Sequence, residues 1–382
     1  MKNKFRYIYI ALVAFSIAII FSACNDDDET SGTPRIDYIR ITEPGASDSL
    51  LVSAGQGQLI AIIGENLKEA VGIEFNNLPA TLTTPYVTNT SILVRVPSEV
   101  PEEVTNQMVL YFKNGSTLTY DFSVSINKPS VTSMECEYVN AGGLAVIHGD
   151  FFYEPLKVIF PGDVEGEIIS VEDNTIKVTV PEGATPGQIS VRSNFGSGLS
   201  SFMFRDNRNI IINSDPFVGW AGSEYVVSNP GTEDPELING NYIRVNKQIG
   251  AWGWTDVVAG SPTDMAPLST NIPDDAIMHP EMYSLKFEVN TIKPFNGSGL
   301  RLVLGLTGYD PGSYTWSPPY DTEGNWETIT IPFKEMVDAY VAAGSQVVVD
   351  INGYYTRVTI FGGTALDCDM CLDNFRIVPN KY

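Results

Sequence analysis

The chain has 382 residues, more than one ordinary domain holds, so about two to four domains are expected. Hydrophobic residues make up 43% of it, which is typical of a globular protein and excludes a disordered chain. The formal net charge of −23 argues against nucleic acid or an anionic membrane face as partner and disfavours an anionic polysaccharide, because all of them repel an acidic surface. Val, Ile, Thr, Gly, Asn and Pro recur while helix-forming patterns are scarce, which predicts an all-β fold.

The first segment has the pattern of a secretory signal. Basic residues at Lys2, Lys4 and Arg6 precede an apolar run from Tyr7 to Phe21. This run is shorter than the roughly 20 residues that a membrane-spanning helix needs. Residues 1–23 are therefore predicted to be a signal peptide.

Phe21-Ser22-Ala23-Cys24 resembles a bacterial lipobox, with Phe where Leu is usual, so Cys24 is the expected lipidation site. An ordinary secretory signal with an unrelated cysteine is the alternative. The acidic run Asn25–Glu29 resembles the surface-export signal of Bacteroidetes lipoproteins. As an acidic run it is equally a solvated tether, and residues 24–33 are expected to be a flexible, acidic leash.

An internal repeat follows. The segment 57–67 matches 143–152, and Thr90–Pro97 matches Asn174–Pro181, each with alternating apolar positions. Gly64 and Gly149 end the first matched strand and are expected to allow a sharp turn. The pattern resembles the immunoglobulin-like IPT/TIG family. The resemblance implies two tandem sandwiches, residues 34–127 and 128–206, that act as spacers or interaction modules.

The composition changes from about Asn207, because all five tryptophans lie beyond this point. Residues 207–382 have the length and the strand signals of one larger β-sandwich. Segments 281–289, 324–332 and 372–378 resemble those of carbohydrate-binding jelly-roll modules. Together with the N-terminal signal and the repeats, this plan resembles the surface glycan-binding lipoproteins of Bacteroidetes polysaccharide-utilisation loci, and is similar to their xyloglucan-binding type.

The candidate site residues are aromatic, because a sugar ring packs its C–H groups on an aromatic face. Trp252 and Trp254 are expected on the same side if their segment is extended, with Asp256 beside them as an acceptor. A place in the core is the alternative for this pair. The Gly- and Pro-rich segment 308–320 is expected to be a rim loop that presents aromatics. The candidates from this loop and from the turn at residues 352–355 are Trp316, Tyr314, Tyr320 and Tyr354. Trp220 and Trp326 are expected in the core.

The resemblance implies a protein that is held at the outer membrane by its lipid and exposed at the cell surface. Such a protein captures a neutral polysaccharide, of plant or β-glucan type, for a TonB-dependent transporter and surface glycoside hydrolases. A glycoside hydrolase or lyase, or an adhesin that binds another protein, are the alternatives. No local motif marks a pair of catalytic carboxylates among the 46 acids, so no catalytic residue is predicted.

Neither a metal nor a redox centre is predicted from the cysteines. The pair Cys368 and Cys371 has neither a preceding βαβ unit nor a second pair, so these residues and Cys136 are expected to be free or locally bridged thiols. No cofactor is expected, although the jelly-roll resemblance raises a bound calcium ion with Asp373 and Asn374 as ligands.

Replacing Cys24 with Ala tests the anchor. We expect the variant to leave the membrane fraction, because the cysteine is the only residue that this reading allows to carry lipid. Replacing Asp26–Glu29 with Ala is expected to leave the protein anchored but inaccessible to added protease. Fractionation and protease shaving measure both outcomes, and a Cys24→Ala protein that stays in the membrane fraction contradicts the assignment.

Overall fold

The computed structural model describes residues 32–43, 45, 49–305 and 313–381. The predicted signal peptide, the lipidation site Cys24 and most of the acidic tether lie outside the described residues. The chain divides into two compact units, Met1–Ile126 and Asn127–Tyr382. Within the described residues, no helix is long and apolar enough to cross a membrane.

The first unit is an antiparallel β-sandwich. Its sheets have the strand orders β1-β3-β6 and β5-β4-β7-β8, and β2 and β9 form a short parallel pair. Alternating residues such as Ile60 and Ile62 are fully buried, which is the period-2 pattern of a strand with one face in the core. The strands are β1 (Arg35–Ile41), β2 (Ser53–Gly55), β3 (Leu59–Glu65), β4 (Ala70–Phe75), β5 (Leu78–Ala80), β6 (Ser91–Arg95), β7 (Gln107–Phe112), β8 (Thr117–Asp121) and β9 (Ser123–Ser125).

The second unit begins with another sandwich, whose strands run in the order β10-β11-β14-β13-β12-β15-β16. The long strand β13 pairs with β12 through Val164–Gly166 and with β14 through Glu167–Glu172. It therefore belongs to both layers of this sandwich. The strands are β10 (Ser130–Met134), β11 (Leu144–Asp150), β12 (Lys157–Phe160), β13 (Val164–Glu172), β14 (Thr175–Thr179), β15 (Ser190–Ser193) and β16 (Gly196–Leu199).

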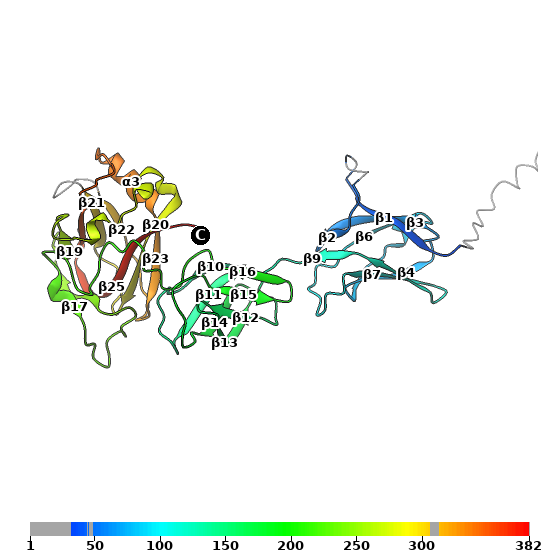
Figure 1. The fold of residues 1–382 in the computed structure, drawn as a ribbon, viewed down its shortest axis with the longest axis horizontal. Helices are drawn as coiled ribbons and strands as arrows, with labels where there is room; N and C mark the ends of the chain where they lie inside the picture. The colour runs from blue at the N-terminus through cyan, green and yellow to red at the C-terminus, as the bar shows by residue number, and fades with distance from the viewer. Residues whose placement is uncertain (1–31, 44, 46–48, 306–312, 382) are drawn as a thin grey trace, which may run out of the picture. The chain divides into compact units, whose positions relative to one another are not determined.

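The rest of the second unit is a larger sandwich of a five-stranded sheet, β17-β18-β25-β20-β23, and a four-stranded sheet, β19-β24-β21-β22 (Figure 1). One apolar cluster fills the space between them, and it includes Val245, Phe287, Leu300, Val358 and Ile377. The elements are β17 (Val226–Val227), β18 (Tyr242–Ile249), β19 (Trp254–Gly260), α2 (Asp274–Met278), β20 (Tyr283–Thr291), β21 (Gly299–Gly305), β22 (Tyr314–Trp316), β23 (Glu327–Pro332), α3 (Phe333–Ala342), β24 (Tyr355–Phe361) and β25 (Leu366–Pro379).

The repeat predicted from the sequence has a structural counterpart, but its glycines have another role. Gly64 and Gly149 lie inside strands, opposite Ile36 of β1 and Val131 of β10, and a bulge follows each of these pairs. A Cβ atom at Gly64 would lie 2.0 Å from the carbonyl oxygen of Arg35, and one at Gly149 would lie 1.9 Å from that of Ser130. The expected sharp turn is wrong at both positions. Glycine is needed there because the neighbouring strand passes too close for a side chain.

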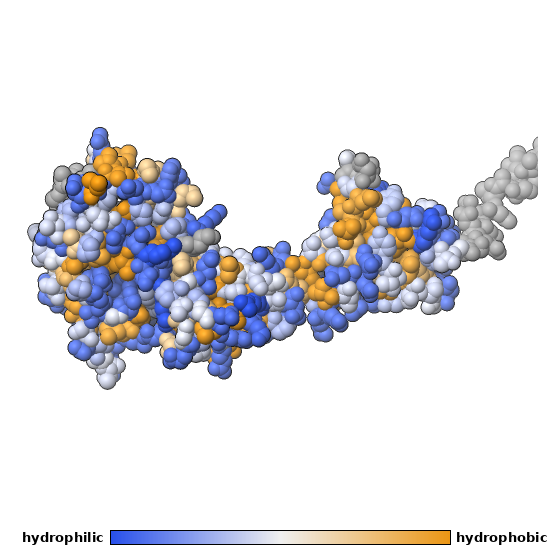
Figure 2. Space-filling model, viewed as in Figure 1, coloured by the Kyte–Doolittle hydropathy of each residue, from blue (hydrophilic) through white to orange (hydrophobic). Residues whose placement is uncertain are grey.

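Hydrophobic side chains are also exposed at one end of the C-terminal sandwich. The end that carries α3 shows a hydrophobic patch in Figure 2. Val341, Val348, Val349 and Ile351 are exposed in this part of the chain. These side chains stay exposed because no described part of the chain packs over them.

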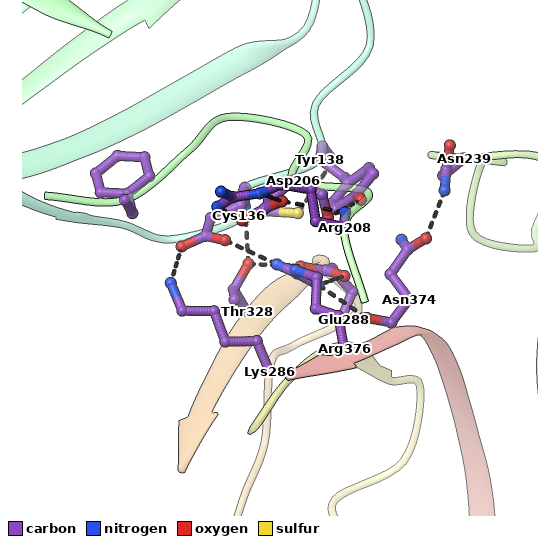
Figure 3. A network of polar contacts seen from close by, with 12 residues as sticks. Cys136, Tyr138, Asp206, Arg208, Asn239, Lys286, Glu288, Thr328, Asn374 and Arg376 are labelled. Carbon is purple, nitrogen blue, oxygen red and sulfur yellow. Dashed lines mark hydrogen bonds and ion pairs between the residues drawn. The ribbon is translucent and has the colours of Figure 1, made fainter. Parts of the chain in front are cut away.

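The two sandwiches of the second unit are joined by a buried ionic network (Figure 3). Arg376 of β25 is fully buried and pairs with Glu288 of β20 at 2.8 Å and with Glu137 at 2.7 Å. Lys286 reaches the other oxygen of Glu137 at 2.5 Å. Glu137 follows β10 in the first of these sandwiches, whereas Arg376, Glu288 and Lys286 belong to the second. The network therefore spans the joint.

Backbone and hydroxyl groups complete the joint. The Glu137 N–H donates to the hydroxyl oxygen of Thr328 at 2.7 Å. The Thr328 N–H donates to the carbonyl oxygen of Glu135, also at 2.7 Å. The Thr328 hydroxyl in turn donates to Glu288 at 2.9 Å. Thr328 belongs to β23 and Glu135 follows β10. A backbone hydrogen bond between them therefore connects the two sandwiches directly.

Arg376→Met tests the network. We expect the variant to lose about 3–5 kcal/mol of unfolding free energy, because Glu137 and Glu288 stay buried without their partner. Burial raises the pKa of Glu288, so the deficit relative to the parent should shrink as pH falls below neutral, because protonation removes the unpaired charge. Denaturant unfolding at several pH values measures this.

Lys334→Met is the matched control, since Lys334 and Asp338 form an exposed pair one helical turn apart. Its loss should be about 0.5 kcal/mol or less. Equal losses in the two variants would contradict a structural role for the buried network.

Candidate binding face

The sheet β19-β24-β21-β22 has one face on the core and one face away from it. Val358 and Ile360 of β24 and Leu300 and Leu302 of β21 belong to the core cluster. Because side chains alternate along a strand, their neighbours point to the opposite face. This outer face carries the side chains discussed below.

Strand register brings aromatic and charged residues of this face together in rows. Trp254 of β19 lies opposite Phe361 of β24. In the next row, Asp256 lies opposite Thr359, and Thr359 lies opposite Arg301 of β21. Paired strands lie about 4.8 Å apart, so neighbours within a row can contact one ligand.

Trp252 extends the aromatic area from the turn before β19. Its backbone has φ of 62°, which is an outlier for a bulky residue. The Trp252 N–H donates to the carbonyl oxygen of Gly362 at 2.9 Å, and its ring centroid lies 6.4 Å from that of Phe361. A Cβ atom at Gly363 would lie 3.1 Å from the Trp252 ring, so only glycine leaves full room there. Two neighbouring backbone segments thus fix an indole that is 71% exposed.

Polar groups flank the aromatic rings. Arg357 donates to both oxygens of Asp256, at 2.7 and 3.1 Å, in a bidentate pair whose side chains are largely buried. Arg301 holds its guanidinium 5.4 Å from the centre of the Phe361 ring. It also donates to the hydroxyl oxygen of Ser313 at 3.0 Å. The face thus combines flat apolar surface with fixed donors and acceptors, which is the chemistry that a sugar ring with its hydroxyls needs.

Of the predicted site residues, three lie on this face. Trp252 is 71% exposed and Trp254 is 66% exposed, so the alternative of a core position is excluded for both. Asp256 is present as well, but it is held by Arg357 and is not a free acceptor. That these residues bind a ligand stays a prediction.

Trp316 does not form an exposed platform. Its ring is stacked on Phe295 at 5.4 Å and packs edge-on against Phe287 at 5.6 Å and Tyr320 at 4.9 Å. The residues around it form the strand β22 rather than the expected rim loop, of which positions 306–312 lie outside the described residues. Sequence alone hid this because its partners are distant along the chain.

The three predicted tyrosines are also held by the protein itself. Tyr354 is buried, and its hydroxyl donates to the carbonyl oxygen of Val348 at 3.1 Å. Tyr314 and Tyr320 are half-buried, with hydroxyls directed to Glu335 at 3.4 Å and to Glu327 at 2.5 Å. Burial, together with the Glu327 carboxylate, raises the pKa of Tyr320. These rings and their hydroxyls therefore serve packing in the structure.

Several residues of the face were missed. Phe361, Arg301 and Arg357 occur in strands whose alternation could have indicated an outer face, but not which strands would be neighbours. Trp220 was expected in the core but is 57% exposed, and its backbone N–H donates to the carbonyl oxygen of Ala259 in β19. Trp326 is half-buried against Tyr242 rather than enclosed.

The cysteines and the expected calcium ligands carry no site of their own. Cys136, Cys368 and Cys371 are free and buried, and burial raises the pKa of Cys368 to about 12. Among the described residues, no three His, Cys, Asp or Glu side chains gather to hold a metal. Asn374 already accepts a hydrogen bond from Asn239 at 2.5 Å. Asp373 and Asn374 alone fall short of the six to eight oxygens that calcium takes, so the fit is poor.

Comparisons with known proteins agree with this geometry. Residues 204–379 match the family model of the surface glycan-binding protein B xyloglucan binding domain, and residues 49–124 match that of the IPT/TIG domain. The chain is homologous to surface glycan-binding proteins of Bacteroidetes. These matches are named for glycan binding and not for a reaction, which agrees with the predicted binding protein without catalysis.

Two relatives illustrate the homology. The surface glycan-binding protein PbSGBP-B of Prevotella bryantii has 26% identity and a TM-score of 0.68, over 92% of this chain and 100% of that one. An IPT/TIG domain-containing protein of Bacteroides ovatus is 28% identical over 165 residues, which are 40% of this chain and 33% of that relative. The match thus spans a third of the length of the curated relative.

A set of tryptophan variants separates exposed from packed rings. Trp252→Ala and Trp254→Ala should each change the unfolding free energy by no more than about 0.5 kcal/mol, because both rings are exposed. Trp316→Ala should cost about 3 kcal/mol, the lower end of the range for a core aromatic, since its ring is half-buried. Thermal and denaturant unfolding measure the difference. A stable Trp316→Ala variant would contradict the packing described here.

Proposed function

We propose that the protein is a cell-surface lipoprotein that binds a neutral polysaccharide on the outer face of the sheet β19-β24-β21-β22. The observation that carries this proposal is the pair of exposed indoles, Trp252 and Trp254, fixed beside Phe361 on one side of a rigid sheet. The matched family model is named for xyloglucan binding, which supports a β-glucan backbone as the ligand class. The Arg301 guanidinium and the pair of Arg357 with Asp256 provide polar surface beside these rings.

Binding alone suits this face better than hydrolysis. The four strands of the sheet contain a single acid, Asp256, and Arg357 holds both of its oxygens. Glycoside hydrolysis commonly uses two carboxylates across the scissile bond. The charge of −23 favours a neutral glycan over an anionic one.

The proposal places the protein on the outer membrane, anchored through lipid on Cys24. There it would capture polymer for a TonB-dependent transporter and for surface glycoside hydrolases. Each contact is weak, and a dense array of anchored copies makes the capture effective. The lipobox-like tetrapeptide and the acidic run that follows it support this location.

Affinity electrophoresis and calorimetry with xyloglucan and mixed-linkage glucan test the proposal. The double variant Trp252→Ala with Trp254→Ala should bind about tenfold to hundredfold more weakly, since an aromatic anchor contributes roughly 1–3 kcal/mol. Tyr86→Ala is the matched control, because Tyr86 is an aromatic ring of the first unit that is 54% exposed. Its affinity should equal that of the parent.

A fragment of residues 127–382 should retain the affinity, and a fragment of residues 32–126 should show none. Unchanged binding by the double variant would place the site elsewhere. If the parent protein binds neither xyloglucan nor mixed-linkage glucan, the proposed function is wrong.

A further inference from the structure

A cleft lies at the joint between the two sandwiches of the second unit, apart from the sheet face described above. It has a volume of about 360 Å³, and its lining includes Leu144 of β11 and Trp326, just before β23. Pro235 and Glu236 line it as well. Its volume falls within the usual range of small-molecule sites.

Part of the lining of the cleft is apolar and packed. Cys136, Tyr138 and Ile238 are buried in a small cluster against which Trp326 packs. The Trp326 ring meets Tyr242 edge-on at 5.5 Å, and its indole N–H donates to the carbonyl oxygen of Glu236 at 3.1 Å. These two contacts hold the half-buried Trp326 indole in the lining of the cleft. A ring held in this way can serve as a surface on which a sugar stacks.

Hydrogen-bonding groups also line the cleft. The side chain of Asn290 is 1% exposed and donates to the carbonyl oxygen of Gly324 at 2.6 Å, but its own Oδ1 has no partner. A buried acceptor without a donor is unusual and is satisfied by a hydroxyl or water. Asn325, Glu135 and Glu236 add exposed polar groups to the lining. These groups favour ligands rich in hydroxyls.

Charge narrows the class of ligand. The lining residues include two acids, Glu135 and Glu236, and neither Lys nor Arg. Phosphates, sulfates and uronic acids would meet uncompensated negative charge there. A neutral ligand meets no such penalty.

The walls of the cleft are held in place before any ligand binds. Glu135 and Trp326 are each two residues from a member of the ionic joint, Glu137 and Thr328. The Thr328 N–H also bonds directly to the carbonyl oxygen of Glu135. A preformed site spends little binding energy on ordering its own side chains.

We propose that this cleft is a second saccharide site that takes one or two neutral sugar units. It rests on the proposed function for its ligand class and adds a site that the face of Trp252 and Trp254 does not include. Two sites on one rigid unit would hold a long polymer by more than one contact, which raises its apparent affinity.

Indole ¹⁵N spectroscopy can observe both sites at once. The five tryptophans give five indole signals, which single Trp→Phe variants assign in the chain without its predicted signal segment. The probes are cellotetraose and a xylogluco-oligosaccharide. In the double variant Trp252→Ala with Trp254→Ala, we expect the Trp326 signal to shift and saturate with added probe.

Leu144→Arg provides the blocking variant, because Leu144 lines the cleft and is 53% exposed, so the change should be tolerated by the fold. It should abolish the shift of Trp326 and leave those of Trp252 and Trp254 intact. Leu199→Arg is the matched control at a 62% exposed leucine of the same sandwich, outside the cleft lining. It should leave all the shifts unchanged.

The outcomes separate the two proposals. Shifts of Trp252 and Trp254 with a silent Trp326, or a Trp326 shift that survives Leu144→Arg, would overturn the second site and leave the first. A Trp326 shift alone, removed by Leu144→Arg, would support the cleft and overturn the sheet face. No shift of any indole with either probe would overturn both.

Discussion

A buried guanidinium between two carboxylates is the constraint on which the second unit depends. Arg376 is fully buried, and removing such a group from water costs several kcal/mol unless its partners are fully in place. Those partners come from two sandwiches, Glu288 from one and Glu137 from the other. The ionic energy is therefore recovered only when both sandwiches are folded and joined. The segment predicted as a spacer is a structural part of the domain that follows it, and the cleft beside Trp326 is a product of this joint.

The outer sheet face follows a different physical logic. Its large rings, Trp252 and Trp254, remain in water at a hydrophobic cost that folding does not recover. The protein holds the Trp252 ring in place instead, through a strained backbone at Trp252 and a glycine at position 363 that makes room for the ring. This face combines fixed apolar surface with paired charges. It suits a ligand whose rings have an apolar C–H face and polar hydroxyl edges. Rigidity lowers the entropy that binding has to overcome.

The sequence predicted the all-β class and the repeat, because both depend on local period-2 patterns and composition. It also named Trp252 and Trp254, but the expected extended segment was wrong for Trp252, which lies in the turn before β19. It failed for Trp316, whose surroundings are formed by Phe287 of β20 and by Phe295 between β20 and β21. Phe361 joined the site only through the pairing of β19 with β24. Strand order across a sheet is non-local, so no window of sequence could reveal it. The roles of Gly64 and Gly149 were misread for the same reason, since the atom that excludes a side chain belongs to another strand.

The shared glycine pairs show that the two small sandwiches are built to one plan, yet they are not interchangeable. Counting from Ile36 and Val131, which lie opposite these glycines, Thr42 in the first copy occupies the position of Glu137 in the second. A first copy moved into the second place would bring no carboxylate to Arg376. Recombination between such modular chains, in nature or in the laboratory, would therefore succeed at the boundary near residue 127 and fail near residue 206. In this architecture the two sandwiches of the second unit would therefore have to be exchanged together.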